Sequence, residues 1–311
     1  MRQYLLRRVI SLLPVLLGVS LITFGLMGLV PGDPAEILAS YGKEVEPTVE
    51  EVEAVRAQLG LDQPLPIRYT RWLGRVVRGD LGQSLCSGGS VWREITVRLP
   101  ATLELTAGGM IVGLLIALPV GILAAVQRDG VVDQLSRALA LLGASVPAFW
   151  LGTMLILLFA VYLGWLPAIG RGGLRHFILP SLALGLGTSA VLMRLIRASL
   201  LEVLDQDYVR TARAKGLRER AVVLRHALKP SLLPVVTVLG LQFGRLLGGA
   251  VIVETIFAWP GLGMFIIESI LARDFPVIQG FALFMSLVFV AINFAVDILY
   301  HWLDPRIQYG T

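Results

Sequence analysis

The feature that most constrains this chain is a series of apolar runs long enough to cross a lipid bilayer. The first run covers residues 9–30, about 22 residues or roughly 33 Å of α-helix, which matches the thickness of a bilayer's hydrocarbon core. Because that core offers no water to the backbone, we expect each run to form a helix. Hydropathy predicts about six spans, at residues 9–30, 101–126, 135–163, 178–200, 231–257 and 277–302.

The composition agrees with a membrane protein. Of the 311 residues, 56% are hydrophobic and 16% are charged, against roughly 25% charged residues in soluble domains. A net charge of +5 would suit a nucleic-acid partner, but the basic residues lie mostly beside spans, as the positive-inside rule expects. The first run exceeds the roughly 7–15 apolar residues of a signal peptide, so we expect it to be retained, with cleavage as the alternative.

Basic residues near the span ends orient the chain. Arg2, Arg7 and Arg8 precede the first span, which places the N-terminus in the cytoplasm, and six crossings return the C-terminus to the same side. The predicted organisation is an N-terminal transmembrane helix (1–30), an extracytoplasmic helical segment (31–100), a five-helix core (101–303) with a cytoplasmic loop (201–230), and a cytoplasmic tail (304–311).

The extracytoplasmic segment has the pattern of soluble helices. Thr48 and Glu51 are spaced as a capping box, and Gly60 marks the end of that helix. Pro66 opens a second helix that Gly79 ends. We therefore expect a small helical cap on the outer face.

Polar side chains inside the spans are the candidates for a translocation path or gate, because they are costly in hydrocarbon. They are Gln242, Arg245, Glu254, Asn293 and Asp297. Helical spacing puts Gln242 with Arg245 on one face, and Asn293 with Asp297 on another. Two roles are the alternatives for these residues. Arg245 and Asp297 form a structural ion pair within the bundle, or the polar side chains line the translocation path.

Two Pro/Gly clusters predict breaks in the spans. Pro147, within GASVPAFWLG, should kink or break the third span because it removes a backbone hydrogen bond. The sequence AWPGLG (258–263) should end the fifth span in a turn, with Trp259 as an interfacial anchor. Both clusters are candidate gate hinges, and the alternative is simple helix ends with close packing.

Motifs for catalysis are missing from the sequence. It has no GxxxxGK[ST] loop for ATP, no GxSxG and no HExxH. Cys86 is the single cysteine, and the histidines lie in loops or at span ends, so no metal-ligand cluster is expected. We predict no catalytic residue, no cofactor bound by this chain and no metal site.

A charged stretch, DQDYVRTARAKGLRERAVVLRHALKP, interrupts the apolar runs on the predicted cytoplasmic side. Asp207 is expected to cap a short helix over 208–215, which Gly216 ends. A second helix over 219–228 follows, and Pro230 opens the next span.

The first of these two helices has a face suited to a partner protein. Its members are Tyr208, Thr211, Ala212 and Lys215, and the small pair Thr211–Ala212 would allow close approach. A DNA-binding helix-turn-helix is disfavoured by the flanking spans. A basic loop that only fixes topology leaves the cap, the glycine stop and the small face unexplained. We favour a docking knob for a cytoplasmic partner.

Several short sequences point to one family in combination. They are YVRTARAKGL (208–217), RHAL (225–228), GGAVIVETIFAWPGLG (248–263), RDFPV (273–277), DILY (297–300), DPRI (304–307), PGDP (31–34), LGLD (59–62) and GDLG (79–82). The first two resemble the EAA loop of ABC-importer permeases, and the whole set resembles the dipeptide/oligopeptide/nickel permease family. The generic loop has Glu-Ala-Ala where this chain has Arg210-Thr211-Ala212, as peptide-type members do.

This resemblance implies an all-α integral membrane protein with the type I ABC importer permease fold, placed in the inner membrane. It implies a half-permease that pairs with a second homologous permease subunit and with two cytoplasmic ATPase subunits, which hold ATP and Mg²⁺. An extracytoplasmic binding protein would deliver the substrate. The residues assigned to ATPase coupling are Asp207, Tyr208, Arg210, Thr211, Ala212, Lys215, Gly216 and Leu217.

The implied substrates are di- or oligopeptides, glutathione, or nickel and its chelates, and the resemblance does not choose among them. Two other function classes stay open beside the importer. An ion-coupled secondary transporter would need no docking helix, and a membrane scaffold or enzyme would need features that the chain lacks.

Overall fold

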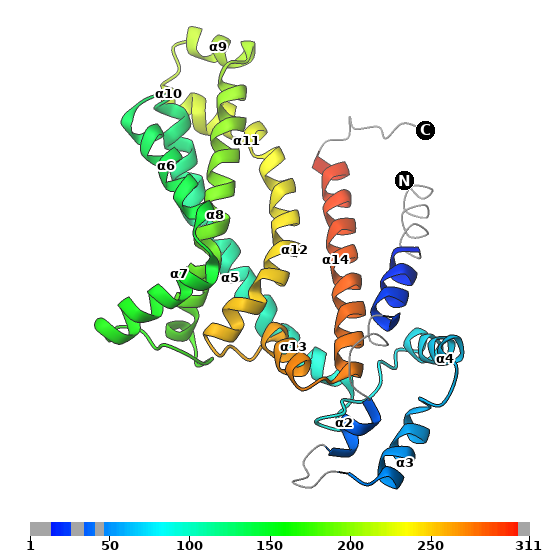
Figure 1. Ribbon diagram of the computed structural model, residues 1–311. Helices are drawn as coiled ribbons and strands as arrows, with labels where there is room; N and C mark the ends of the chain where they lie inside the picture. Colours follow the sequence, from blue (N-terminus) through cyan, green and yellow to red (C-terminus); the bar gives the residue numbers. More distant parts are fainter. Residues whose placement is uncertain (1–13, 26–33, 41–46, 304–311) are drawn as a thin grey trace. The chain divides into compact units, whose positions relative to one another are not determined.

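The computed structural model describes residues 14–25, 34–40 and 47–303, and this part of the chain is largely helical (Figure 1). A helix at Pro14–Gly25 comes first. The labelled elements that follow are α2 (Pro34–Ser40), α3 (Val49–Leu59), α4 (Leu65–Val77), α5 (Val91–Val126), α6 (Val131–Ser145), α7 (Ala148–Leu155), η1 (Ile156–Tyr162), α8 (Leu174–Leu204), α9 (Asp207–Ala214), α10 (Glu219–Ala221), η2 (Val222–Ala227), α11 (Leu228–Ser231), α12 (Leu233–Ile256), α13 (Leu262–Leu271) and α14 (Phe275–Leu303). The described ranges contain no strand, only a single bridge between Gln83 and Ser90, so the all-α class is confirmed.

The long helices stand where hydropathy predicts spans. Four described helices are long and apolar enough to cross a membrane: α5, α8, α12 and the Phe275–Val296 part of α14. A fifth span results if α6 and the stretch Ala148–Tyr162 are counted together. Of the predicted first span, the structure describes the apolar helix Pro14–Gly25, and the rest of residues 9–30 lies outside the described ranges, as do residues 304–311.

The third predicted span is broken, and Pro147 is the cause. α6 ends at Ser145, Val146 is extended with ψ of 122°, and Pro147 occupies the N-cap of α7. The two halves are bent by 100°. Proline has no N–H to donate, so it is tolerated at a helix start and not in the interior. The predicted break at Pro147 is confirmed.

The chain forms two compact units. The first comprises residues 1–99 and 265–291, and the second comprises residues 100–264 and 292–311.

In the first unit, α3 begins and ends as its sequence predicts. The Thr48 hydroxyl accepts the Glu51 N–H at 3.3 Å, and the Glu51 carboxylate accepts the Thr48 N–H at 3.1 Å, which is a capping box. Gly60 ends the helix at a φ of +64°. The predicted start of this helix at Thr48 and its predicted end at Gly60 are confirmed.

The next helix, α4, packs its apolar side on the first apolar helix. Its first turn holds Pro66, as predicted, and Trp72 is buried. The Phe24 ring lies 5.4 Å from Tyr69 and 5.5 Å from Trp72. Tyr69 and Ser20 share a hydrogen bond of 2.8 Å. These contacts join α4 to the helix Pro14–Gly25.

A buried carboxylate, that of Asp274, joins two distant segments of the first unit by hydrogen bonds. Asp274 accepts the Ser84 hydroxyl at 2.5 Å and the N–H groups of Leu85 and Cys86 at 3.1 and 3.3 Å. Because these donors lie almost 190 residues earlier, the bonds join the end of the cap to the loop before α14.

In the second unit, α5 and α8 pack closely through glycines. A Cβ placed on Gly109 would lie 2.7 Å from the Leu184 Cβ, and one on Gly185 would lie 2.6 Å from a Val112 methyl. Small residues let membrane helices approach closely enough for tight van der Waals packing.

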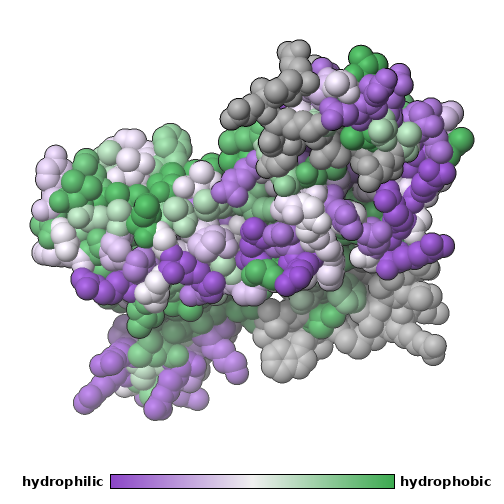
Figure 2. Space-filling view, turned by 90° about the horizontal axis from the view of Figure 1, so that it is seen from below, coloured by the Kyte–Doolittle hydropathy of each residue, from purple (hydrophilic) through white to green (hydrophobic). Residues whose placement is uncertain are grey.

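Many large apolar side chains remain exposed on the helices. Examples are Leu115, Leu139, Leu141, Phe149 and Trp150. Figure 2 shows apolar patches beside hydrophilic ones on one face of the molecule. Such surfaces fit lipid or another apolar helix rather than water.

We predict that Gly185→Val destabilises the α5–α8 contact by about 1–3 kcal/mol, because the added methyls overlap Val112. The midpoint of thermal unfolding of the purified chain in detergent measures this loss. Gly248→Val is the matched control, because a Cβ there meets nothing within 4 Å. Equal midpoints for the two variants would show that the glycine contact is unimportant.

Candidate functional site

The charged stretch folds as a compact helical unit, here called the knob (residues 205–231), at the end of α8. In Figure 1, α9 lies at one end of α8 and α7 lies near the other. After α9, the chain turns at Gly216 and runs through α10, η2 and α11 as one helical segment. The predicted pair of short helices is therefore present, and the second extends to Ser231.

Two predicted details of the knob are wrong. Gln206, not Asp207, occupies the N-cap of α9, and it makes no side-chain cap hydrogen bond. Asp207 is the first helical residue, and its side chain is 97% exposed beside Arg210. An acidic group there still favours the helix through its dipole. Pro230 lies within α11, and the next span, α12, begins at Leu233 with Pro234 in its first turn.

The face predicted to receive a partner is split. Ala212 is only 6% exposed, because it packs with Val209 on the inner side of α9, in a cluster with Leu200 and Val222. Tyr208, Thr211, Lys215 and Leu217 are exposed. The expectation that Ala212 offers a small outer surface is wrong, because helical spacing gives the residues of a face and not its direction.

Gly216 and a nearby ion pair fix the turn of the knob. Gly216 has a φ of +79°, a conformation that suits glycine and strains other residues. Arg213 binds both oxygens of Glu219, at 2.7 and 3.1 Å, and donates to the Leu204 carbonyl at 3.3 Å. The hydrogen bond from Arg213 lowers the pKa of Glu219. One guanidinium thus joins the ends of α8 and α9 to the start of α10.

A buried ion pair joins α8 to α6. The Asp133 side chain is fully buried and accepts two hydrogen bonds from Arg197, at 2.5 and 2.6 Å. It also accepts the Asp129 N–H at 3.0 Å, and Arg137 lies 3.5 Å away. Breaking such a pair leaves an uncompensated buried charge, which is strongly destabilising. Neither this pair nor the Arg213–Glu219 pair is among the contacts predicted from the sequence. The sequence does hold a signal for the Arg213–Glu219 pair, because these opposite charges lie six residues apart on either side of the turn at Gly216.

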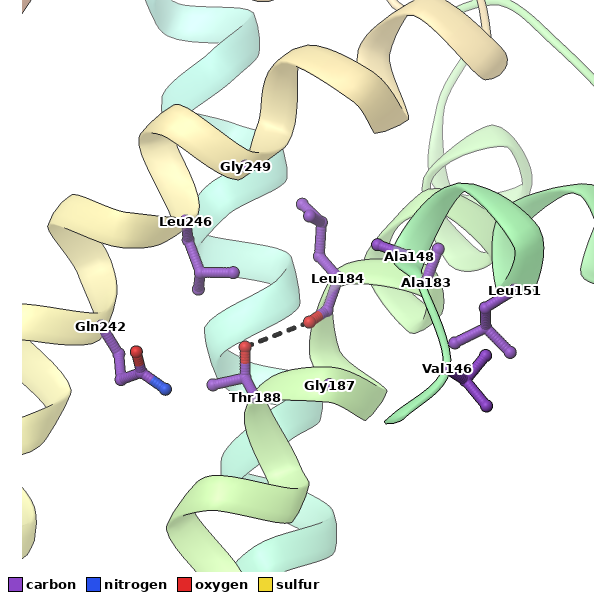
Figure 3. A pocket seen from close by; sticks show the side chains of 10 residues that line it. All are labelled: Val146, Ala148, Leu151, Ala183, Leu184, Gly187, Thr188, Gln242, Leu246 and Gly249. Atoms are coloured by element: carbon purple, nitrogen blue, oxygen red, sulfur yellow. Dashed lines mark hydrogen bonds between the residues drawn. The ribbon is translucent and has the colours of Figure 1, made fainter. Parts of the chain in front are cut away.

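A cavity of about 200 Å³ lies beside the break at Pro147 (Figure 3). Its walls come from the α6–α7 junction, α8 and α12, and its lining residues are Val146, Ala148, Leu151, Ala183, Leu184, Gly187, Thr188, Gln242, Leu246 and Gly249. The lining of the cavity includes one predicted path residue, Gln242, and the two neighbours of another, Pro147.

The other predicted path residues lie elsewhere. Arg245 is exposed on α12, whereas Gln242, one turn earlier, is buried. Asn293 is half-buried on α14. The side chain of Asp297 is outside those that the structure describes, so its pairing with Arg245 stays a prediction.

Glu254 holds the turn that follows α12. Its side chain is fully buried, and one oxygen accepts the N–H groups of Gly263 and Met264 at 2.6 and 3.2 Å. A Cβ on Gly261 would lie 2.4 Å from this carboxylate, so the close approach needs glycine there. The Leu262 N–H bonds the Thr102 hydroxyl at 2.8 Å, which joins the same turn to α5.

The role predicted for Trp259 as an interfacial anchor is wrong. Trp259 is buried, and its indole N–H donates to the Ala101 carbonyl at 2.9 Å. Its ring therefore packs the turn after α12 against α5, next to Phe177.

Acidic, histidine and cysteine side chains do not gather into a metal site in the described ranges, where no group of three or more could hold an ion.

We predict that Glu254→Gln keeps the turn intact, whereas Glu254→Leu destabilises the protein. The amide oxygen of glutamine can still accept the Gly263 and Met264 N–H groups. Leucine would leave both unpaired, at roughly 1–3 kcal/mol for each. Thermal unfolding of both variants measures the difference, and equal loss in both would show that the charge, not the acceptor, matters.

Comparisons with known proteins agree over the whole chain. Residues 117–309 match the family model described as binding-protein-dependent transport system inner membrane component, and residues 1–106 match the N-terminal model of such components. The chain is 46% identical to the glutathione transport system permease protein GsiC of Pectobacterium atrosepticum and 47% identical to that of Salmonella paratyphi A. Each alignment covers 309 residues, 99% of this chain and 100% of the relative.

Solved structures show the same fold. The inward-facing MetNI methionine ABC transporter matches with a TM-score of 0.58 at 22% identity, over 68% of this chain and 96% of that chain. An amino acid ABC transporter with histidines matches with a TM-score of 0.54 at 18% identity, over 68% and 94%. The chain therefore belongs to the binding-protein-dependent transport system inner membrane component family, as a multi-pass permease subunit of an ABC importer.

Proposed function

We propose that this chain forms one half of the translocation path of an ATP-driven importer for glutathione or other short peptides. The observation that carries the proposal is the similarity to glutathione permeases over the full length of both chains. A second homologous permease subunit supplies the other half. An extracytoplasmic binding protein delivers the peptide, and the chain itself hydrolyses nothing.

The knob is the proposed docking site for a cytoplasmic ATPase subunit, and ATP and Mg²⁺ are held by that partner. The exposed residues of α9 and of the following turn, Tyr208, Arg210, Thr211, Lys215 and Leu217, offer it a mixed surface of aromatic, basic and small side chains. This orientation requires both chain termini on the cytoplasmic side, with residues 31–100 outside.

Two ion pairs connect the knob mechanically to the helices α8 and α6. Arg213 ties α9 and α10 to the end of α8, and Arg197 ties α8 to Asp133 at the start of α6. A displacement of the knob by the ATPase would therefore move α6 and α8 together. The break at Pro147 then lets α7 change its angle to α6, which would open or close the path beside the cavity.

We predict that Thr211→Trp weakens ATPase binding roughly 5- to 150-fold, because overfilling a packed contact costs about 1–3 kcal/mol. Thr211 is exposed, so the fold is kept. Co-purification of the ATPase subunits with the membrane-inserted chain measures the effect. Gln134→Trp, another exposed position, is the control and should bind normally.

Ala212→Trp should behave differently, because Ala212 is buried. That change should loosen the knob itself and raise its sensitivity to a protease. If Thr211→Trp retained normal ATPase binding and normal uptake, the knob would not be the docking site.

The substrate is tested by uptake in cells that lack their own transporters. The complete complex should import labelled glutathione or alanyl-alanine in an ATP-dependent manner, and should not import Ni²⁺ added alone. Uptake of Ni²⁺ without peptide uptake would replace the peptide proposal with the nickel alternative. Uptake that survives ATP depletion would instead indicate a secondary transporter.

A further inference from the structure

The cavity at the Pro147 break contains a polar group that makes no hydrogen bond to the other lining residues. Gln242 is only 8% exposed, and it lies in the tenth position of the 24-residue helix α12. Figure 3 shows one hydrogen bond among the lining residues, from the Thr188 hydroxyl to the Leu184 carbonyl at 3.1 Å, and none at the Gln242 amide. Hydrocarbon offers such an amide no hydrogen-bond partner, so a polar ligand in the path would supply one.

The rest of the lining restricts what that partner is. Beside Gln242 and Thr188, all lining side chains are apolar or absent, and none is charged. A primary amide donates and accepts hydrogen bonds, as a peptide group does. The cavity therefore suits an uncharged peptide group with a small apolar side chain. It offers no carboxylate, imidazole or thiolate, the ligands that divalent transition metals prefer.

The cavity is large enough for a part of a ligand and too small for a whole one. Its volume of about 200 Å³ is below the roughly 300–1,000 Å³ of pockets that enclose a whole small molecule. Two glycines keep it open, since a Cβ on Gly187 or Gly249 would meet nothing within 4 Å. Gly249 is exposed at its mouth, so the cavity is reached from the exposed side of α12.

We propose that this cavity is a subsite inside the membrane that receives one residue of the transported peptide and hydrogen-bonds its backbone through Gln242. The inference rests on the proposed function, because it needs a peptide in the path. It makes Gln242 a specificity-determining residue. Because the cavity adjoins the α6–α7 break, an occupied subsite would also bear directly on the hinge at Pro147.

Site-specific labelling tests occupancy without relying on transport. In a Cys86→Ser background the chain has no other cysteine, so Gly249→Cys introduces a single thiol at the cavity. The labelling rate of this chain by N-ethylmaleimide is then measured in the complete complex, in the resting state and with ATP and vanadate. Glutathione or alanyl-alanine should slow the labelling severalfold in at least one state, and Ni²⁺ alone should not.

Gly248→Cys in the same background is the matched control. Gly248 is also exposed and also has open space around its Cα, but it does not line the cavity. Peptide should leave its labelling rate unchanged. Equal protection at both positions would indicate a general conformational change and would overturn the subsite.

Transport by two further variants tests the roles of the space and the amide. Gly249→Leu fills the cavity and should impair peptide import, whereas Gly248→Leu should import normally. Gln242→Leu should lower kcat/KM for peptide about fivefold, the equivalent of one neutral hydrogen bond, with assembly unchanged. Normal import by both Gly249→Leu and Gln242→Leu would mean that the cavity holds only lipid or nothing.

The outcomes separate this inference from the function beneath it. If the wild-type complex imports no peptide, the proposed function fails and the subsite fails with it. If the wild-type complex imports peptide while labelling and variants show no effect, the function stands and only the subsite is refuted.

Discussion

A lipid bilayer offers no hydrogen-bond partner to a peptide group, and the rest of this structure follows from that constraint. Continuous helices satisfy it along α5, α8, α12 and α14. Where the backbone is not helical, other groups of the protein supply its hydrogen bonds. Glu254 accepts the N–H groups of the turn after α12, and the Phe257 carbonyl accepts the Gly170 N–H at 2.7 Å. At these two places a neighbouring group completes the hydrogen bonding of the irregular backbone.

The sequence was a good guide to features set by local chemistry. Span positions follow from hydropathy, the capping box from Thr48 and Glu51, and the break from Pro147, whose missing N–H no context can replace. The stop at Gly216 belongs to the same class, because a φ of +79° suits glycine in any fold.

Features set by tertiary packing could not be predicted from local sequence patterns. Ala212 is expected on the face that receives a partner and Trp259 at the membrane interface, yet both are buried, because helical spacing and residue type do not say what covers a face. The Asp133–Arg197 pair joins residues 64 positions apart, and no local pattern announces it. Family resemblance supplied the function, while the structure supplied the cavity that groups Gln242 with the neighbours of Pro147.

The Asp133–Arg197 pair also has a consequence for biogenesis. A ribosome adding about 5–20 residues per second delivers Arg197 roughly 3–13 s after Asp133, given their 64-residue separation. During that interval the carboxylate lacks the two hydrogen bonds of Arg197 and has Arg137, four residues later, as its neighbouring cation. The full set of hydrogen bonds at Asp133 is thus completed only after α8 has emerged, so the packing of α6 against α8 is a late step in folding.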